Sequence, residues 1–208
     1  MTTQTTPNTT LSKVVSLVLH PLVMPLLATI VVVYGNATSV TYLPTLKPFV
    51  VWSVAGMTLA TPILFWGLVR LLVNKGHGIA DDGKMRRMML LATELCLVGC
   101  GSVFAKFAML FVVRKVLYTA AVVVAVLWIM EWLWPLCHHS AAIGALLSVE
   151  WVLLYVGNVG LLWPFIATIL AAGVVCSARL ALAKEPSVRV YVGLLVGIAV
   201  GFATFILL

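Results

Sequence analysis

Three short polar segments interrupt an otherwise apolar chain, at residues 74–87, 136–140 and 184–189. Together with the ends of the apolar runs beside them, they hold a set of cationic and imidazole side chains: Lys84, Arg86, Arg87, His138, His139 and Arg179. Guanidinium groups bind phosphate oxygens bidentately, and a nearby histidine is suited to donate a proton. These residue types therefore indicate a phosphate site. The alternative is that the cations only follow the excess of Lys and Arg in loops on one side of a membrane.

The elements that must position these residues are membrane helices. Of the 208 residues, 63% are hydrophobic and 9% are charged, and the mean hydropathy is +1.16. A soluble domain is about half apolar and about a quarter charged, so this composition excludes one. Seven apolar runs can be recognised, at residues 14–34, 49–73, 88–111, 116–135, 140–156, 161–183 and 189–208. A membrane helix needs about 20 apolar residues, so we expect an all-α polytopic membrane bundle of six to seven transmembrane helices.

The number of spans between the polar segments predicts where these segments meet. Two spans separate the first from the second, and two more separate the second from the third, so all three face the same side of the membrane. The N-terminus shares that side and the C-terminus does not. The opposite rim offers Lys47, Arg114 and Lys115 but no His or Asp. Polar segments that converge on one rim of a bundle can build a site.

The domain organisation follows from the same pattern. Residues 1–13 form a polar, Thr-rich tail, and residues 14–208 form a single transmembrane domain. The net charge of +7 reflects membrane topology or an anionic headgroup, rather than nucleic acid. We therefore expect a membrane lipid or lipid phosphate as partner and no nucleic acid.

Around Arg179 the spacing resembles the third motif of the type 2 phosphatidic acid phosphatase superfamily, membrane enzymes that hydrolyse lipid phosphates without a metal. In that motif an Arg binds phosphate, a His six residues later is the nucleophile, and an Asp four residues further on orients the His. In this chain Ser177-Ala178-Arg179 stands at the Arg, Glu185 at the His and Arg189 at the Asp. The following helix carries the two expected glycines, Gly193 and Gly197.

The other two motifs of the family are partly present. His139 matches the His that protonates the leaving group, and Cys137 stands where that motif has Ser. The first motif corresponds to a basic cluster without the family's proline: Lys84, Arg86 and Arg87. Compact bacterial members are also similar at His20-Pro21 and Pro25.

The resemblance implies that a lipid phosphate or pyrophosphate headgroup binds at one membrane face. Its phosphate-binding residues would be Lys84, Arg86, Arg87 and Arg179, and its catalytic positions would be His139 and Glu185. No His follows His139 in the sequence, so the family's phosphohistidine cannot form at the third motif. We therefore expect impaired or lost phosphomonoesterase activity.

The resemblance also implies an environment, namely the inner membrane of a bacterium, with no metal or cofactor. The excess of Lys and Arg predicts that the site faces the cytoplasm. Familiar bacterial relatives carry their site on the periplasmic side. Both orientations therefore stay open.

Three acidic residues inside the apolar runs support a different function. At a rise of 1.5 Å per residue, Glu94, Glu131 and Glu150 lie about 10 to 16 Å below the polar rim, at similar depth. Such groups cost at least about 2.5 kcal/mol each in a membrane unless they are paired or hydrated. They could line the cavity of a small proton-coupled transporter. Protonated carboxyls that are hydrogen-bonded between helices, in a non-catalytic structural subunit, are a further alternative.

Overall fold

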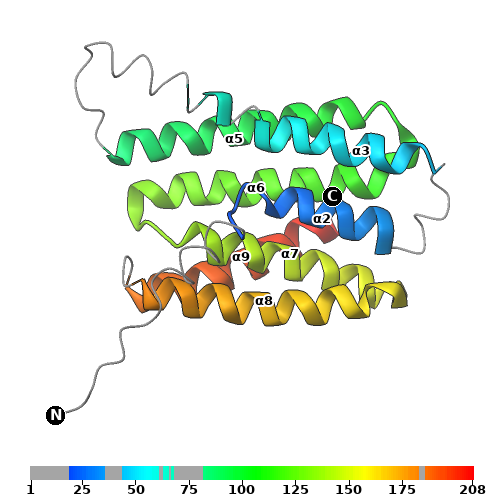
Figure 1. The fold of residues 1–208 in the computed structure, drawn as a ribbon. Helices are drawn as coiled ribbons and strands as arrows, with labels where there is room; N and C mark the ends of the chain where they lie inside the picture. The colour runs from blue at the N-terminus through cyan, green and yellow to red at the C-terminus, as the bar shows by residue number, and fades with distance from the viewer. Residues whose placement is uncertain (1–18, 36–43, 61–62, 66, 68–81, 183–185) are drawn as a thin grey trace.

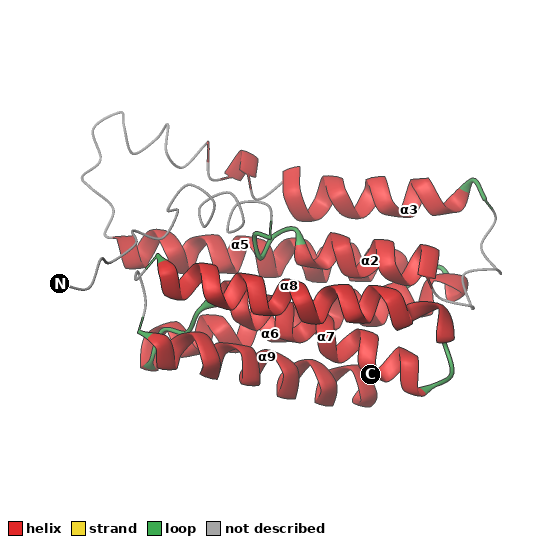
Figure 2. Cartoon of the chain, turned by 60° about the horizontal axis from the view of Figure 1, so that its bottom comes forward, coloured by secondary structure: helices red, strands yellow, loops and turns green. Residues whose placement is uncertain are grey.

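The computed structural model describes residues 19–35, 44–60, 63–65, 67, 82–182 and 186–208. All regular structure in these ranges is helical (Figures 1 and 2). The elements are α2 (Met24–Gly35), α3 (Leu46–Ala55), the π-helix η2 (Gly56–Ala60), α5 (Asp82–Phe104), the 3-10 turn η3 (Ala108–Leu110), α6 (Phe111–Leu133), α7 (His138–Tyr155), the 3-10 turn η4 (Val159–Leu161), α8 (Leu162–Ala181) and α9 (Ser187–Leu207).

Five stretches of the described chain are long and apolar enough to cross a membrane: Leu46–Phe65, Gly83–Phe104, Ala108–Leu133, Val159–Ala181 and Ser187–Leu207. This confirms the prediction of an all-α bundle with membrane-spanning helices. Two further helices, α2 and α7, are not among these five. The 12 residues of α2 reach about 18 Å, less than the roughly 30 Å of a bilayer core. The 18 residues of α7 include two His and one Glu.

Prolines set several helix boundaries. The first apolar run was predicted as one span, but α2 begins only at Met24, after the turn that contains Pro21. Pro25 lies in the first turn of α2, where its missing N–H costs no helical hydrogen bond. At the same end of the bundle, α6 ends at Leu133 and Pro135 follows two residues later. Proline cannot continue a helix, so the chain there is extended before α7 starts.

The described polar segments meet at one end of the bundle, as the count of spans predicted. Figure 1 shows the start of α5, the end of α6, the start of α7 and the end of α8 on its left-hand side. Helix α7 lies in the interior, packed against α2, α6, α8 and α9. The backbone N–H of Cys137 donates to the carbonyl of Arg189 at 3.3 Å, which links the starts of α7 and α9. We call this end the polar rim.

Helices α7 and α9 approach at backbone distance because glycines line their contact. A Cβ on Gly197 would overlap the backbone of Ala141, and a Cβ on Gly193 would lie 2.8 Å from the carbonyl oxygen of Cys137. On the facing helix, a Cβ on Gly144 would lie 2.5 Å from the carbonyl oxygen of Leu194. Small residues at such crossings let membrane helices pack tightly. This contact holds α7, and with it both adjacent histidines, in place.

Candidate functional site

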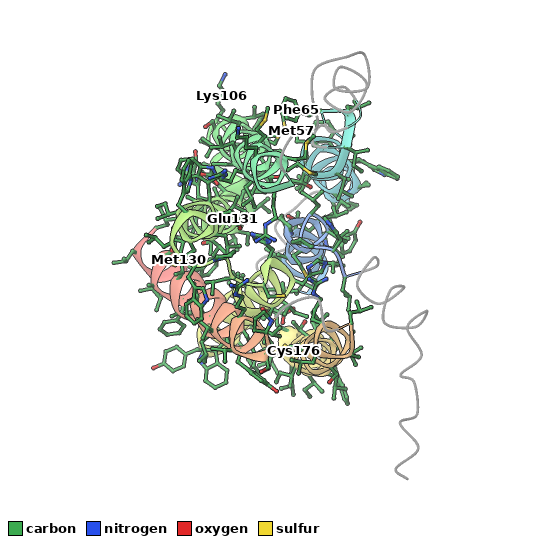
Figure 3. All side chains as sticks on the ribbon, turned by 90° about the vertical axis from the view of Figure 1, so that its left-hand side faces the viewer. Met57, Phe65, Lys106, Met130, Glu131 and Cys176 are labelled. Atoms are coloured by element: carbon green, nitrogen blue, oxygen red, sulfur yellow. The ribbon has the colours of Figure 1, made fainter. Side chains whose placement is uncertain are left out.

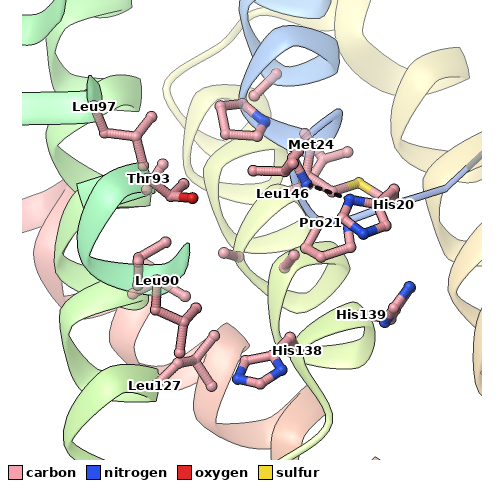
Figure 4. A pocket seen from close by; sticks show the side chains of 18 of the residues that line it. His20, Pro21, Met24, Leu90, Thr93, Leu97, Leu127, His138, His139 and Leu146 are labelled. Atoms are coloured by element: carbon pink, nitrogen blue, oxygen red, sulfur yellow. Dashed lines mark hydrogen bonds between the residues drawn. The ribbon is translucent and has the colours of Figure 1, made fainter. Parts of the chain in front are cut away.

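A cavity of about 330 Å³ lies between α2, α5, α6 and α7. Most of the side chains that line it are apolar, as Figure 4 shows for Met24, Leu97 and Leu146. Beyond it, toward the opposite rim, the bundle is filled by buried side chains that include Phe104, Leu110, Val113 and Leu153. The bundle thus contains the cavity at the end of the polar rim and a packed apolar core at the other end.

Three helices contribute matching stripes to the cavity wall. The lining residues extend from Arg86 to Leu97 on α5, from Val116 to Leu127 on α6, and from His138 to Val149 on α7. Each stripe contains twelve residues, and its eleven steps of 1.5 Å give a length of about 16 Å. The cavity is therefore about as deep as one leaflet of a bilayer, since the whole hydrocarbon core measures about 30 Å.

Cationic and imidazole side chains line the same cavity at the rim: His20, Arg86, His138, His139 and Arg179. The His20 and His139 rings meet edge to face, with centroids 5.4 Å apart. The Nδ1 atom of His20 accepts a hydrogen bond from the backbone N–H of Leu22 at 3.3 Å (Figure 4). The Arg179 guanidinium lies close enough to act electrostatically on the His20 ring. A polar group at this end would thus meet donors from α5, α7 and α8 and from the turn before α2.

Glu131 holds two of these side chains together. The Arg86 Nη2 atom lies 2.7 Å from each oxygen of the Glu131 carboxylate, and the His138 Nε2 atom lies 3.5 Å from Oε2. The Glu131 side chain is only 7% exposed, and Figure 3 shows it within the bundle. Because one nitrogen makes both contacts, the Nε of Arg86 is buried without a hydrogen-bond partner among the described residues. Arg86 therefore keeps donors for a further anion.

The sequence placed Glu131 deep in the membrane, whereas the structure places it two residues from the end of α6 and in contact with His138. The error came from counting helical rise through residues 134–137, which do not belong to a helix. The signal that could have corrected it is Pro135, since a proline soon after an apolar run marks the end of a helix.

The basic cluster at the start of α5 divides between the cavity and the surface. Arg86 lines the cavity. The Arg87 guanidinium instead stacks over the Trp132 ring at 4.1 Å and donates through Nε to the carbonyl of Gly83 at 3.2 Å. Lys84 is exposed. Neither Arg87 nor Lys84 is among the cavity-lining residues, and Glu185 lies outside the described residues.

The structure does not bring Glu94, Glu131 and Glu150 together at the cavity, since none of them is among its lining residues. Glu150 is fully buried between α7 and α8, where it accepts a hydrogen bond from the Thr168 hydroxyl at 3.1 Å. The Oε2 atom of Glu94 is buried on α5 without a hydrogen-bond partner in the described part of the chain. This cavity is therefore not a polar chamber shared by the three glutamates.

Glu131→Gln is expected to lower the free energy of unfolding by about 1 to 2 kcal/mol, because Arg86 and His138 lose a charged acceptor. The value stays low because the Arg86 side chain is 40% exposed and can turn toward water. Thermal unfolding in detergent measures the change. Glu94→Gln is the matched control and should leave stability unchanged, since no partner is lost there. Equal stability of wild type and Glu131→Gln would contradict the assigned ion pair.

The arrangement can bind an anion and offer it a proton. Arg86 and Arg179 supply positive charge from two sides of the rim, and His20, His138 and His139 supply imidazole groups that can donate hydrogen bonds. No group of three or more metal-ligating side chains occurs within the described ranges. In comparisons with known proteins, no family model matches the chain, and no curated protein or solved structure is significantly similar to it.

Proposed function

We propose that this chain is an integral membrane protein that binds a lipid phosphate or pyrophosphate at its polar rim. The headgroup is held by Arg86 and Arg179, with His139 as the proton donor. The hydrocarbon chain of the ligand occupies the apolar cavity below. The chain crosses the inner membrane of a bacterium six to seven times. Helix α7 is one of these crossings, and its neighbouring helices shield it from lipid.

One observation carries this proposal: two arginines that are 93 residues apart in sequence line the rim of one cavity whose depth is apolar. An isolated cation at a helix end is explained by extension toward the membrane surface. That explanation does not require two arginines and three histidines to converge on a shared cavity. Ligand pockets combine an apolar wall with a few polar groups in this way.

Charge and shape favour an amphiphile over a small anion. Charge-assisted hydrogen bonds from Arg86 and Arg179 suit phosphate oxygens, which accept forked donors. Inorganic phosphate would leave the apolar part of the cavity without an apolar occupant. A lipid phosphate satisfies both regions at once.

We further propose that phosphomonoesterase activity is impaired or lost. The family's double displacement needs a nucleophile six residues after Arg179, and the sequence has Glu185 there. A carboxylate near arginines forms ion pairs readily and has no histidine-like proton chemistry at neutral pH. The pocket would then bind a lipid phosphate without hydrolysing it.

The test is phosphate release by purified protein in detergent, from phosphatidic acid, phosphatidylglycerol phosphate and undecaprenyl pyrophosphate. Wild type should release none. Glu185→His should release phosphate from at least one substrate, and adding Arg179→Ala should remove that activity. Release by wild type that depends on Arg179 would contradict the impaired state. If Glu185→His releases no phosphate from any substrate, residue 185 is not the position of the lost nucleophile.

A further inference from the structure

One hydroxyl group among the described residues of the cavity wall makes no hydrogen bond to its own helix. Thr119 on α6 is 1% exposed and lines the cavity. Its Oγ1 atom is buried and has no hydrogen-bond partner among the described residues. Buried hydroxyls are nearly always paired, so an orphan next to a cavity indicates a missing occupant with a hydrogen-bonding group.

Other threonines in helices make a local hydrogen bond that Thr119 does not make. Five of them donate to the carbonyl oxygen four residues earlier, at 2.6 to 3.0 Å: Thr29, Thr58, Thr93, Thr168 and Thr204. This local bond is available to Thr in most helices. Thr119 does not make it. Its hydroxyl therefore remains available to a group in the cavity.

The position of Thr119 on α6 gives the distance between the polar rim and the group that Thr119 would bind. Thr119 precedes Glu131 by twelve residues on α6, which corresponds to about 18 Å along the helix. Its neighbours in the deep wall are apolar, among them Leu97, Val116 and Val149. The orphan hydroxyl thus lies near the closed end of the cavity, opposite the cationic rim.

We propose that Thr119 binds a hydroxyl group at the far end of the ligand's chain. The ligand is then a single-chain amphiphile with phosphate at one end and a hydroxyl roughly twelve carbons away. A zigzag of twelve carbons spans about 15 Å, which fits between the rim and Thr119. The Thr119 hydroxyl can both donate to and accept from that group. This inference rests on the proposed function and specifies its ligand.

The test compares dodecyl phosphate with 12-hydroxydodecyl phosphate, by titration of purified protein in detergent. Micelles take up the plain chain more readily, so the readout is how the preference for the hydroxylated ligand changes between proteins. This preference should be about tenfold larger in wild type than in Thr119→Val. Thr119→Ser should keep it. Thr204→Val is the matched control, since Thr204 bonds to Val200 and is not among the lining residues.

The outcomes separate this inference from the function on which it rests. In one outcome, dodecyl phosphate binds and its binding requires Arg179, but Thr119→Val leaves the preference for the hydroxylated ligand unchanged. The inference about Thr119 then fails, and the phosphate site is retained. The cavity would then hold a plain chain or a water molecule beside Thr119. If neither ligand binds to wild type, the proposed function fails and this inference with it. Thr119→Val removes an unpaired hydroxyl and adds no volume, so it should fold as stably as wild type.

Discussion

Arg179→Ala is expected to weaken the binding of dodecyl phosphate about a hundredfold. The substitution removes a guanidinium that can form two charge-assisted hydrogen bonds to the phosphate, each worth about 1.5 kcal/mol or more. Arg86 alone does not compensate, because Glu131 already neutralises much of its charge. Titration calorimetry in detergent, at fixed ionic strength, measures the loss.

Arg114→Ala is the matched control for this prediction. Arg114 lies near the start of α6, away from the polar rim, and its guanidinium stacks over Phe111 at 5.2 Å. Its removal changes the net charge equally and should leave binding unchanged. Equal losses of affinity in both variants would mean that phosphate binding depends only on the net charge of the protein. Full binding in Arg179→Ala would remove Arg179 from the site.

Gly197→Ala is expected to lower the free energy of unfolding by about 3 kcal/mol, at the upper end of the cost of overpacking. The added methyl would lie 2.8 Å from both the Cα and the carbonyl carbon of Ala141. These are backbone atoms, so no side-chain rotation can relieve the overlap. Helices α7 and α9 must move apart, which also displaces His138 and His139. Thermal unfolding followed by circular dichroism reports the loss.

Gly173→Ala is the control for the glycine prediction. It lies on α8, where a Cβ would meet no atom within 4 Å. Alanine is the better helix former, so stability should be equal or slightly higher. If Gly197→Ala were as stable as Gly173→Ala, the tight crossing of α7 and α9 would be wrong.

Much of the fold follows from hydrophobic run lengths and prolines. The described helices α5, α6, α8 and α9 overlap predicted apolar runs, and the convergence of polar segments followed from counting spans. Two predicted boundaries were wrong: α5 begins at Asp82, inside the predicted polar segment, and α6 begins at Phe111 and continues through residues 112–115, where the sequence predicted a break. The first run was harder to predict. A continuous apolar sequence looks like one span, and the turn at Pro21 shortens the helix that follows it.

The site could be predicted by residue type but not by contact. Helical periodicity alone would have separated Arg86 from Arg87, because Arg86 shares its face with Met89, Leu90 and Thr93. The partner of Arg86 needed the position of α6 against α5, which no local pattern gives. The orphan state of Thr119 depends on a side-chain rotamer, which the sequence does not specify.

A phosphate headgroup bound at the polar rim is expected to direct a hydrocarbon chain into the cavity. Photolabelling with a dodecyl phosphate that carries a diazirine on its chain tests it directly. We predict labels on cavity residues such as Leu97, Ala120 and Leu146, which are lost in Arg179→Ala and in excess unlabelled ligand. Labels confined to outward-facing residues such as Leu95, Leu170 and Leu195, unaffected by either treatment, would contradict it.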